Sequence, residues 1–407
     1  MSGARAEVIE KPNILELAGV GVQPSGVRLT NQRVILTLIS NNPGSSAAEL
    51  SRLSKLAPQT VAAILDDLDK AGLVKAGQVL RGRRGQPATP YFVNPDAAYT
   101  IGIEVGWQHV EARLVNIGGM VLGEYRRDYA YPDARTLFTE LGQVVRQLQS
   151  KLSIAEQERL LCVGVAAPNG IDRNISLLNP DPDVRAQWSR IDFRESLEAA
   201  VRLPVQVFND GNAACWAELG AHPKPRPATF AYVLISTFVG AGIVTDGTLW
   251  EGPTGNSANL GSMLITDRHG DHNFVHLIAS IYALQQRLAG AGIVVPQTTP
   301  LFWPWEEWEP HVSDWIDDAG YALAKCLMNT VAVIELNYVV IDGVMPASVT
   351  DRLIARIREN FARLPTLTFD QPTVAKGHLG GAAPATGAAY LPLYRRYFSR
   401  DLNHLSE

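Results

Sequence analysis

Helical and alternating patterns of apolar residues divide the chain into two parts. Residues 29–40, 47–54 and about 58–71 carry apolar side chains at helical spacing, which predicts three short helices. Ser46 and Glu49 have the spacing of a capping box at the start of the second helix. Beyond the first hundred residues, runs of alternating apolar and polar residues predict strands. The pattern therefore predicts a small helical domain before a larger α/β body.

The residues after the third helix complete the small domain. "LVKAGQVLRGRRGQPATPYFV", residues 73–93, is typical of two strands joined by a basic, glycine-rich turn. Three helices and a hairpin form a winged helix-turn-helix, whose third helix enters the major groove while the hairpin forms the wing. The alternative is an exposed basic hairpin that has no partner. The expected DNA contacts are Gln59 and Thr60 on the third helix and Arg81, Arg83 and Arg84 on the wing.

Two similar meanders organise the larger part of the chain. Residues 99–129 and 229–252 each have the pattern of three strands joined by turns. The first meander is followed by an amphipathic helix predicted over residues 135–157. A later apolar strand delivers Asn209 and Asp210 to its carboxyl end, where α/β sheets place their ligands. The repetition predicts a duplicated α/β fold with a cleft between its halves.

Composition and charge limit the classes of protein to consider. Of the 407 residues, 46% are apolar and 19% are charged, as in an ordinary globular chain of two or three domains. Residues 1–95 hold 11 Lys or Arg and 7 Asp or Glu, a net charge of +4, which favours a polyanionic partner. With no apolar run of membrane-spanning length, no secretory signal and three distant cysteines, we expect a cytoplasmic protein with buried thiols.

Five stretches of the sequence carry a family resemblance when they are taken together. They are "GIEVGWQHVEARLVN", "VGVAAPNGID", "LPVQVFNDGNAACWAE", "STFVGAGIVTDGTLWEGPTGNSANLGS" and "ATGAAYL". Jointly they resemble the ROK family (repressors, open reading frames and sugar kinases) of the actin-like ATPase superfamily. We therefore expect an α/β protein with a flexible segment over residues 1–27, a winged helix-turn-helix over residues 28–95 and a two-lobed, actin-like ROK domain over residues 96–398.

The resemblance also implies that the nucleotide site is degenerate. The family's first phosphate loop, Asp-x-Gly-Gly-Thr, reads Glu-Val-Gly-Trp-Gln over residues 104–108, and Trp107 should obstruct the phosphates. The second loop has lost two glycines, one of them to Phe238, and the family's Gly-Gly beside the adenosine reads Asp342-Gly343. We therefore expect a protein that is not an enzyme and has no cofactor. The alternative is sequence drift in a kinase that is still active.

The sugar side of the cleft is altered too. Asp210 matches the family's catalytic base, and we interpret it as a vestigial base that binds sugar hydroxyls, although an Asp at a strand end can also cap a helix. The family's Glu-x-Gly-His reads Asn-Leu-Gly-Ser over residues 259–262, which removes the charge and the zinc-binding histidine. The resemblance thus implies five effector-binding residues, which are Asn179, Asn209, Asp210, Asn259 and Ser262.

Histidines raise the question of a metal site. The family's cysteine-rich zinc knuckle is replaced by "DRHGDHNFVHLIAS". His269, His272 and His276 lie in this run, yet structural zinc usually needs thiolates or four convergent ligands. We interpret the three histidines as surface residues and expect no metal.

Tryptophans leave further alternatives open. Trp188 corresponds to a family tryptophan near the sugar, or it packs in the core. "TTPLFWPWEEWEP", residues 298–310, holds Trp303, Trp305 and Trp308. These three side chains could form a ligand-stacking lid, a loop that contacts a partner, or an interdomain packing surface.

These expectations combine into one function. We expect a DNA-binding transcriptional repressor of carbohydrate metabolism genes, controlled by a sugar or polyol effector in a degenerate kinase-like cleft. A homodimer or homotetramer on an inverted-repeat operator is expected, with no membrane partner. Two rival classes remain, which are a working ATP-dependent sugar kinase with a fused DNA-binding domain and a ligand-insensitive scaffold or constitutive repressor.

Overall fold

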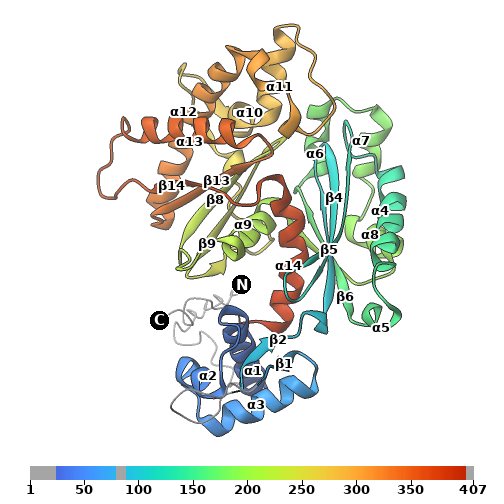
Figure 1. Cartoon of the computed structure of the whole chain (residues 1–407). Coiled ribbons are helices and arrows are strands. Elements are labelled where there is room, and N and C mark those ends of the chain that lie inside the picture. Colours follow the sequence, from blue (N-terminus) through green and yellow to red (C-terminus); the bar gives the residue numbers. More distant parts are fainter. Residues whose placement is uncertain (1–23, 79–88, 400–407) are drawn as a thin grey trace, which may run out of the picture.

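A small helical domain stands at one end of two sheet-containing lobes (Figure 1). The computed structural model describes residues 24–78 and 89–399. The small domain consists of α1 (Pro24–Asn41), α2 (Ala47–Ser54), α3 (Pro58–Lys70) and the antiparallel pair β1 (Val74–Ala76) and β2 (Tyr91–Val93). The three predicted helices and the hairpin are therefore confirmed. Helix α1 begins at Pro24, before the predicted domain limit at residue 28, and the wing residues Arg81, Arg83 and Arg84 lie outside the described residues.

Local sequence signals set the elements of the small domain. The Ser46 hydroxyl accepts a hydrogen bond from the Glu49 amide, and the Glu49 carboxylate accepts one from the Ser46 amide at 2.8 Å, so the predicted capping box is present. Gly72 adopts a φ of +69° directly after α3, a conformation that favours glycine at the end of a helix. Apolar faces of all three helices form the buried core of this domain.

The first lobe is a five-stranded sheet in the order β5-β4-β3-β6-β7. Its strands are β3 (Tyr99–Val105), β4 (His109–Asn116), β5 (Val121–Asp128), β6 (Leu160–Ala167) and β7 (Val205–Asn209). Strands β3, β4 and β5 form the predicted antiparallel meander, and β6 and β7 continue the sheet in parallel. Helices α4 (Ala134–Gln149) and α8 (Phe193–Val201) pack together on its outer side. The helix predicted over residues 135–157 is broken, because Ser153 starts a new capping box at α5 (Ile154–Gln157).

The second lobe repeats this plan in the order β10-β9-β8-β13-β14. Its strands are β8 (Phe230–Ile235), β9 (Val239–Thr245), β10 (Thr248–Leu249), β13 (Tyr338–Gly343) and β14 (Thr373–Lys376). Again three antiparallel strands are followed by two parallel ones, so the predicted duplication is confirmed. The helices above this sheet are α10 (His276–Ala279), α11 (Ile281–Gly290), α12 (His311–Ile334) and α13 (Ala347–Phe361), beside a small hairpin of β11 (Leu264–Thr266) and β12 (His272–Phe274).

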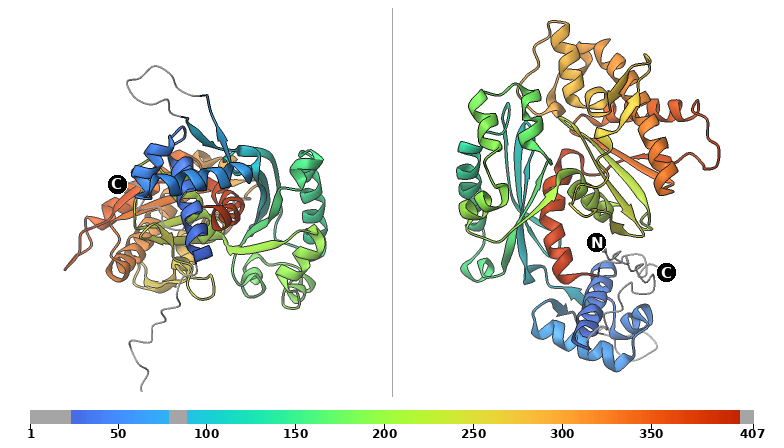
Figure 2. Two further views of the ribbon diagram at one scale, coloured as in Figure 1. Left: turned by 90° about the horizontal axis from the view of Figure 1, so that it is seen from below. Right: turned by 180° about the vertical axis from the view of Figure 1, so that it is seen from behind.

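Two helices lie between the sheets and join the lobes. Helix α9 (Asp210–Ala221) packs on β9 of the second lobe, while α14 (Ala383–Tyr397) packs on β3 and β6 of the first lobe and on α9 (Figures 1 and 2). Glycines allow this close approach, because a Cβ atom on Gly387 would overlap the carbonyl oxygen of Ala213, and one on Gly164 would overlap that of Ala388. None of the helices within residues 24–78 and 89–399 is long and apolar enough to span a membrane.

The helix pair gives a prediction for stability. Gly387→Ala should lower the free energy of unfolding by about 1–3 kcal/mol, because the new methyl group forces α14 away from α9. Gly220→Ala is the matched control, since this residue of α9 has open space around its Cβ position and should gain about 0.5–1 kcal/mol from the better helix former. Urea unfolding curves of both variants measure the two effects. Equal changes in the free energy of unfolding would show that the close packing of α14 on α9 does not contribute to stability.

The tryptophans lie in the cores of the lobes. Trp303, Trp305 and Trp308 are buried with Trp315 in the core of the second lobe, so they form neither a lid nor a partner loop. Trp188 is buried in the first lobe, where its indole N–H donates to the Pro132 carbonyl at 2.8 Å. The reading of Trp188 as a core residue is therefore confirmed.

Candidate effector site and DNA-binding surface

A cavity of about 400 Å³ lies between the lobes. It opens where β3, β6, β7 and β8 end, as expected for a ligand site in α/β sheets. Four of the five predicted effector residues line it, which are Asn209, Asp210, Asn259 and Ser262. These four come from both halves of the chain, so the structure brings them together around one space.

Asn179 is the predicted effector residue that the structure places elsewhere. It follows a short 3-10 helix (Ile175–Leu178) with a φ of +51° and has an exposed side chain, away from the cavity lining. Other amides that line the cavity were not predicted. They include Asn169 from the turn after β6 and Asn256 from the second lobe, which are hydrogen-bonded to each other at 2.7 Å across the cleft.

Asp210 stands at the first turn of α9, inside the cavity. Asn209 is the N-cap of this helix, accepting from the Asn212 amide at 3.0 Å, so the capping role considered for Asp210 belongs to its neighbour. The Asp210 carboxylate accepts from the Gly211 amide at 2.8 Å and from the Asn209 side chain at 3.0 Å. Burial, together with the nearby charge of Glu104, raises the pKa of Asp210 to about 6.

Glu104 provides a second carboxylate in the cavity. It is the second-last residue of β3, and only 4% of its surface is exposed. One of its oxygens lies 3.2 Å from Nε2 of the buried His109. Asp210 and Glu104 together offer several acceptor atoms to the hydroxyl groups of a ligand.

An aromatic pair links the two segments that were predicted to be altered phosphate loops. Trp107 follows β3 in the first lobe, and Phe238 lies between β8 and β9 of the second. Their rings meet edge to face with centroids 5.1 Å apart, and each residue is 7% exposed. Phe238 packs within the core of the first lobe, so this contact ties the lobes together.

Asp342 lies at the position where the sequence analysis expected a third altered nucleotide element. Its buried carboxylate accepts hydrogen bonds from the amides of Gly343 and Gly380, at 2.9 and 2.8 Å, and from the Tyr232 hydroxyl at 3.2 Å. These two amides and the hydroxyl group are therefore already hydrogen-bonded to the Asp342 carboxylate. This carboxylate lies outside the lining of the cavity.

His276 is a site residue that the sequence analysis wrongly placed on the surface. It starts α10, lines the cavity, and its ring fills the space left open by the missing side chain of Gly261. Burial lowers the pKa of His276 to about 4, so the ring is neutral at pH 7. Because Nδ1 accepts from the Val239 amide at 3.1 Å, the proton of the neutral ring is on Nε2. His276 thus supplies a hydrogen-bond donor.

The lowered pKa of His276 predicts an acid sensitivity. The unfolded chain binds a proton here near pH 6.5, whereas the folded protein does so only near pH 4, so this group's stabilisation is lost as pH falls from about 6.5 to 4. His276→Gln should reduce that loss by about 2 kcal/mol, measured by urea unfolding at pH 4.5 and 7. The exposed His272→Gln should follow the wild-type protein. If the curves of His276→Gln and wild type coincide, the ring is not held in its neutral form.

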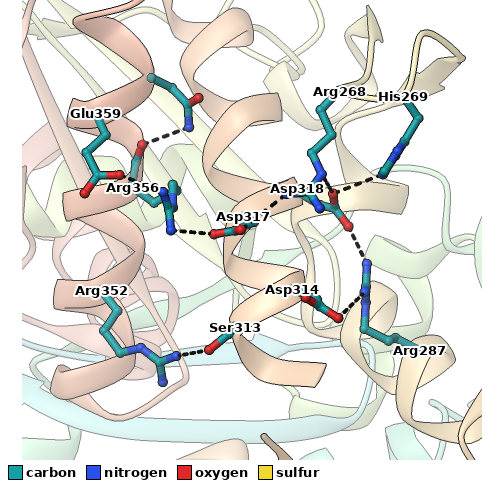
Figure 3. A network of polar contacts seen from close by, with 11 residues as sticks. Arg268, His269, Arg287, Ser313, Asp314, Asp317, Asp318, Arg352, Arg356 and Glu359 are labelled. Carbon is teal, nitrogen blue, oxygen red and sulfur yellow. Dashed lines mark hydrogen bonds and ion pairs between the residues drawn. The ribbon is translucent and has the colours of Figure 1, made fainter. Parts of the chain in front are cut away.

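The other two histidines of the predicted surface run, His269 and His272, make separate contacts in the second lobe. His272 Nδ1 lies 3.3 Å from the Thr266 hydroxyl, and His269 Nε2 lies 3.5 Å from Asp318. Asp318 also pairs with Arg268 at 2.7 Å and with Arg287, so ion pairs hold the turn between β11 and β12 on α12 and α11 (Figure 3). Among the described residues, no group of three or more His, Cys, Asp or Glu side chains could hold a metal ion.

The candidate DNA-binding surface within the described residues is the start of α3. Gln59 and Thr60 are exposed in the first turn of α3, and this helix lies at the end of the molecule farthest from the lobes (Figure 1). They border a shallow groove with Arg28 and Asn31 of α1. Arg28 is paired with Asp67 through a 3.0 Å hydrogen bond, which holds α1 against α3. The geometry exposes the two predicted base-reading residues and buries the opposite face of α3 in the core.

Comparison with known families assigns both parts of the chain. Residues 28–75 match the winged helix-turn-helix DNA-binding family, and residues 100–394 match the ROK family. The chain belongs to the ROK family. The fold class and the resemblance predicted from the sequence are thereby confirmed.

Known relatives of this ROK protein include regulators and kinases. It is 29% identical over 248 residues to the xylose repressor of Bacillus subtilis (strain 168), a match that covers 59% of this chain and 61% of the repressor. It is 30% identical over 171 residues to the N-acetylmannosamine kinase of Shigella boydii serotype 18, covering 42% of this chain and 55% of the kinase. A crystal structure of a ROK family transcriptional regulator, a homolog of the E. coli MLC protein, aligns with a TM-score of 0.66 at 19% identity, covering 94% of this chain and 100% of that chain. This last similarity shows a shared fold.

Proposed function

We propose that this protein is a DNA-binding transcriptional repressor of carbohydrate metabolism genes whose effector is a sugar or polyol. The observation that carries the proposal is the combination of a winged helix-turn-helix with a ROK cleft that keeps Asp210 while Trp107 and Phe238 occupy the space between its phosphate loops. As a regulator of genes it would act in the cytoplasm. The repressor similarity noted above agrees with this role.

The chemistry of the cavity fits a polyhydroxylated ligand. Asp210 and Glu104 accept hydrogen bonds from hydroxyl groups, and neutral His276 donates one to a ligand oxygen. Trp107 and Phe238 offer an apolar wall for the carbon face of a sugar ring. A cavity of about 400 Å³ is large enough for such a ligand.

The proposed mechanism is a population shift between arrangements of the lobes. An effector that contacts Asp210 on α9 and Asn259 in the second lobe favours one arrangement of the cleft, and α14 connects this change to α1. In a homodimer or homotetramer the paired winged helices then change their spacing, which alters affinity for an inverted-repeat operator.

Binding to DNA tests the proposal directly. Fluorescence anisotropy should show that the full chain binds DNA from its own upstream region about a thousandfold more tightly than unrelated DNA at physiological salt. D-xylose, D-glucose and N-acetyl-D-mannosamine are then added to find sugars that change this affinity. Equal, weak binding to both DNAs would refute the repressor function. Discriminating binding that no sugar alters, with an unchanged melting temperature, would favour the constitutive repressor instead.

The rival kinase function makes an opposite prediction. Because Trp107, Phe238 and Asp342 fill positions where a nucleotide's phosphates and adenosine would need backbone donors, ATP with Mg²⁺ should leave the melting temperature unchanged within 1 °C. No ADP should be released in the presence of the three sugars. Sugar-dependent ADP release would establish the kinase and overturn the assignment as a non-enzyme.

A further inference from the structure

A second cavity, of about 480 Å³, lies where the winged helix domain meets the ROK domain. Its walls come from α1, from the second half of α9 and from the end of α14. Two hydrogen bonds fix α1 beside it, because the Lys224 ammonium donates to the Asn41 carbonyl at 2.6 Å and the Ser399 amide donates to the Thr37 hydroxyl at 2.9 Å. A ligand in this space would therefore contact both the DNA-binding domain and the lobes.

Aromatic side chains form one wall of this junction cavity. Trp216 of α9 and Tyr394 of α14 meet edge to face with ring centroids 4.5 Å apart, and Tyr390 lines the same space. Trp216 is 8% exposed, and its indole N–H has no hydrogen-bond partner among the described residues. Among the described residues this N–H is not one of the buried polar atoms that lack a partner, so solvent reaches it and it can donate to a ligand acceptor in the cavity that Trp216 lines.

The charge of the junction cavity is positive. Two arginines and no Asp or Glu occur among the described residues that line it. Arg113 is neutralised by Glu111 and Glu124, at 2.8 and 3.2 Å. Arg226 donates only to the carbonyls of Gly220 and His222, at 3.0 and 3.4 Å, and no described carboxylate lies within 4 Å of it. Burial lowers the pKa of Arg226, as expected for a cation that has lost water and gained no counter-charge.

We propose that the junction cavity is a second ligand site, which binds a small aromatic carboxylate. The ring lies against Trp216 and Tyr394, and the carboxylate accepts from the Arg226 guanidinium and the Trp216 indole N–H. Charge complementarity favours an anion over a neutral or cationic compound in this space. This site is separate from the effector cavity, which lies at the other end of α9.

A ligand in the junction cavity should change the affinity for DNA. This inference rests on the proposed function as a DNA-binding repressor. The walls include Thr37 and Asn41 of α1, so the ligand binds best when the winged helix domain has this position on the lobes. Binding of the ligand and binding of DNA are then coupled. By linkage, each partner changes the affinity for the other by the same factor.

Salicylate and benzoate are the probes for the junction cavity, and the cation benzamidine is the matched control for shape. Isothermal titration of the full chain should give binding of both carboxylates in the micromolar to millimolar range and none of benzamidine. Trp216→Phe keeps an aromatic side chain but removes the N–H and part of the indole surface, so it should weaken salicylate about five- to tenfold. Arg226→Met should weaken it tenfold or more. Asp210→Asn, at the effector cavity, should leave salicylate binding unchanged.

Each other outcome contradicts the proposal in a defined way. No binding of either carboxylate, or equal binding of benzamidine, would refute the anion site. Salicylate affinity unchanged in Trp216→Phe and Arg226→Met would place any binding elsewhere, and loss of affinity in Asp210→Asn would place it in the effector cavity. Because Arg226 also caps the end of α9, Trp216→Phe is the decisive variant if Arg226→Met does not fold. DNA affinity measured without salicylate tests the proposed repressor function separately.

Discussion

Asp210→Asn should make the folded protein more stable and remove its response to the effector. The carboxylate has a pKa of about 6 in the folded protein and near 3.8 in the unfolded chain, so the folded state binds more protons between these values. The stability that this group contributes is therefore present at low pH and is lost as pH rises through 6. At pH 7 the ionised, half-buried carboxylate lowers the free energy of unfolding by up to about 2–3 kcal/mol, and asparagine removes this cost.

Urea unfolding at pH 8 and pH 4 measures this effect. Asp210→Asn should be more stable than the wild-type protein at pH 8, with the difference shrinking at pH 4. Asp172→Asn, at an exposed acid on α6 (Ile171–Asn174), is the control and should change little at either pH. A destabilised Asp210→Asn would mean that the carboxylate makes a net favourable contribution to the fold.

The same substitution should greatly weaken effector binding. An ionised carboxylate is a stronger acceptor for sugar hydroxyls than an amide, and asparagine brings a donor that faces hydroxyl hydrogens. For a sugar that changes DNA affinity, we expect about a hundredfold weaker binding to Asp210→Asn. Wild-type affinity should fall about tenfold from pH 7 to pH 5, because the ionised fraction of Asp210 falls by that factor. An unchanged affinity in the variant would remove Asp210 from the effector site.

Features that depend on neighbouring residues in the chain could be predicted from the sequence. The capping box of Ser46 and Glu49, the helices of the small domain and the two meanders follow from local spacing, and all are present. Asn209 and Asp210 were placed correctly in the cleft because an apolar strand followed at once by a helix fixes its polar end residues at the sheet edge.

Features that depend on tertiary packing could not be predicted from the sequence. His276 reaches the cavity because Gly261, from another segment, leaves room for its ring, and no local pattern signals that contact. Asn179 has a left-handed φ of +51° and lies outside the lining of the cleft, whereas Asn169 and Asn256 meet across it. The Trp303–Trp308 segment has a polar surface-like sequence, yet its rings fill a core supplied by α12.

Removing the three wing arginines should cause the largest loss of DNA affinity. Arg81, Arg83 and Arg84 lie outside the described residues, so this prediction rests on their sequence between β1 and β2. Each cation that neutralises a phosphate adds about 0.9 to the slope of log K against log salt concentration. The triple alanine variant should therefore bind both its upstream DNA and unrelated DNA a hundredfold or more weakly at low salt, with a slope reduced by about 2–3.

Gln59→Ala should behave in the opposite way, which separates reading of bases from holding of phosphates. Its amide is exposed on the first turn of α3, so its loss should relax preference at one base pair by about 1–3 kcal/mol and leave the salt slope unchanged. Lys70→Ala is the control for charge, because Lys70 stands at the far end of α3 in an ion pair with Asp66 and should alter neither quantity. Anisotropy titrations from 50 to 300 mM salt distinguish the three variants. If the wing variant keeps the wild-type slope, its arginines do not contact phosphates, and the winged helix domain binds DNA through α3 alone.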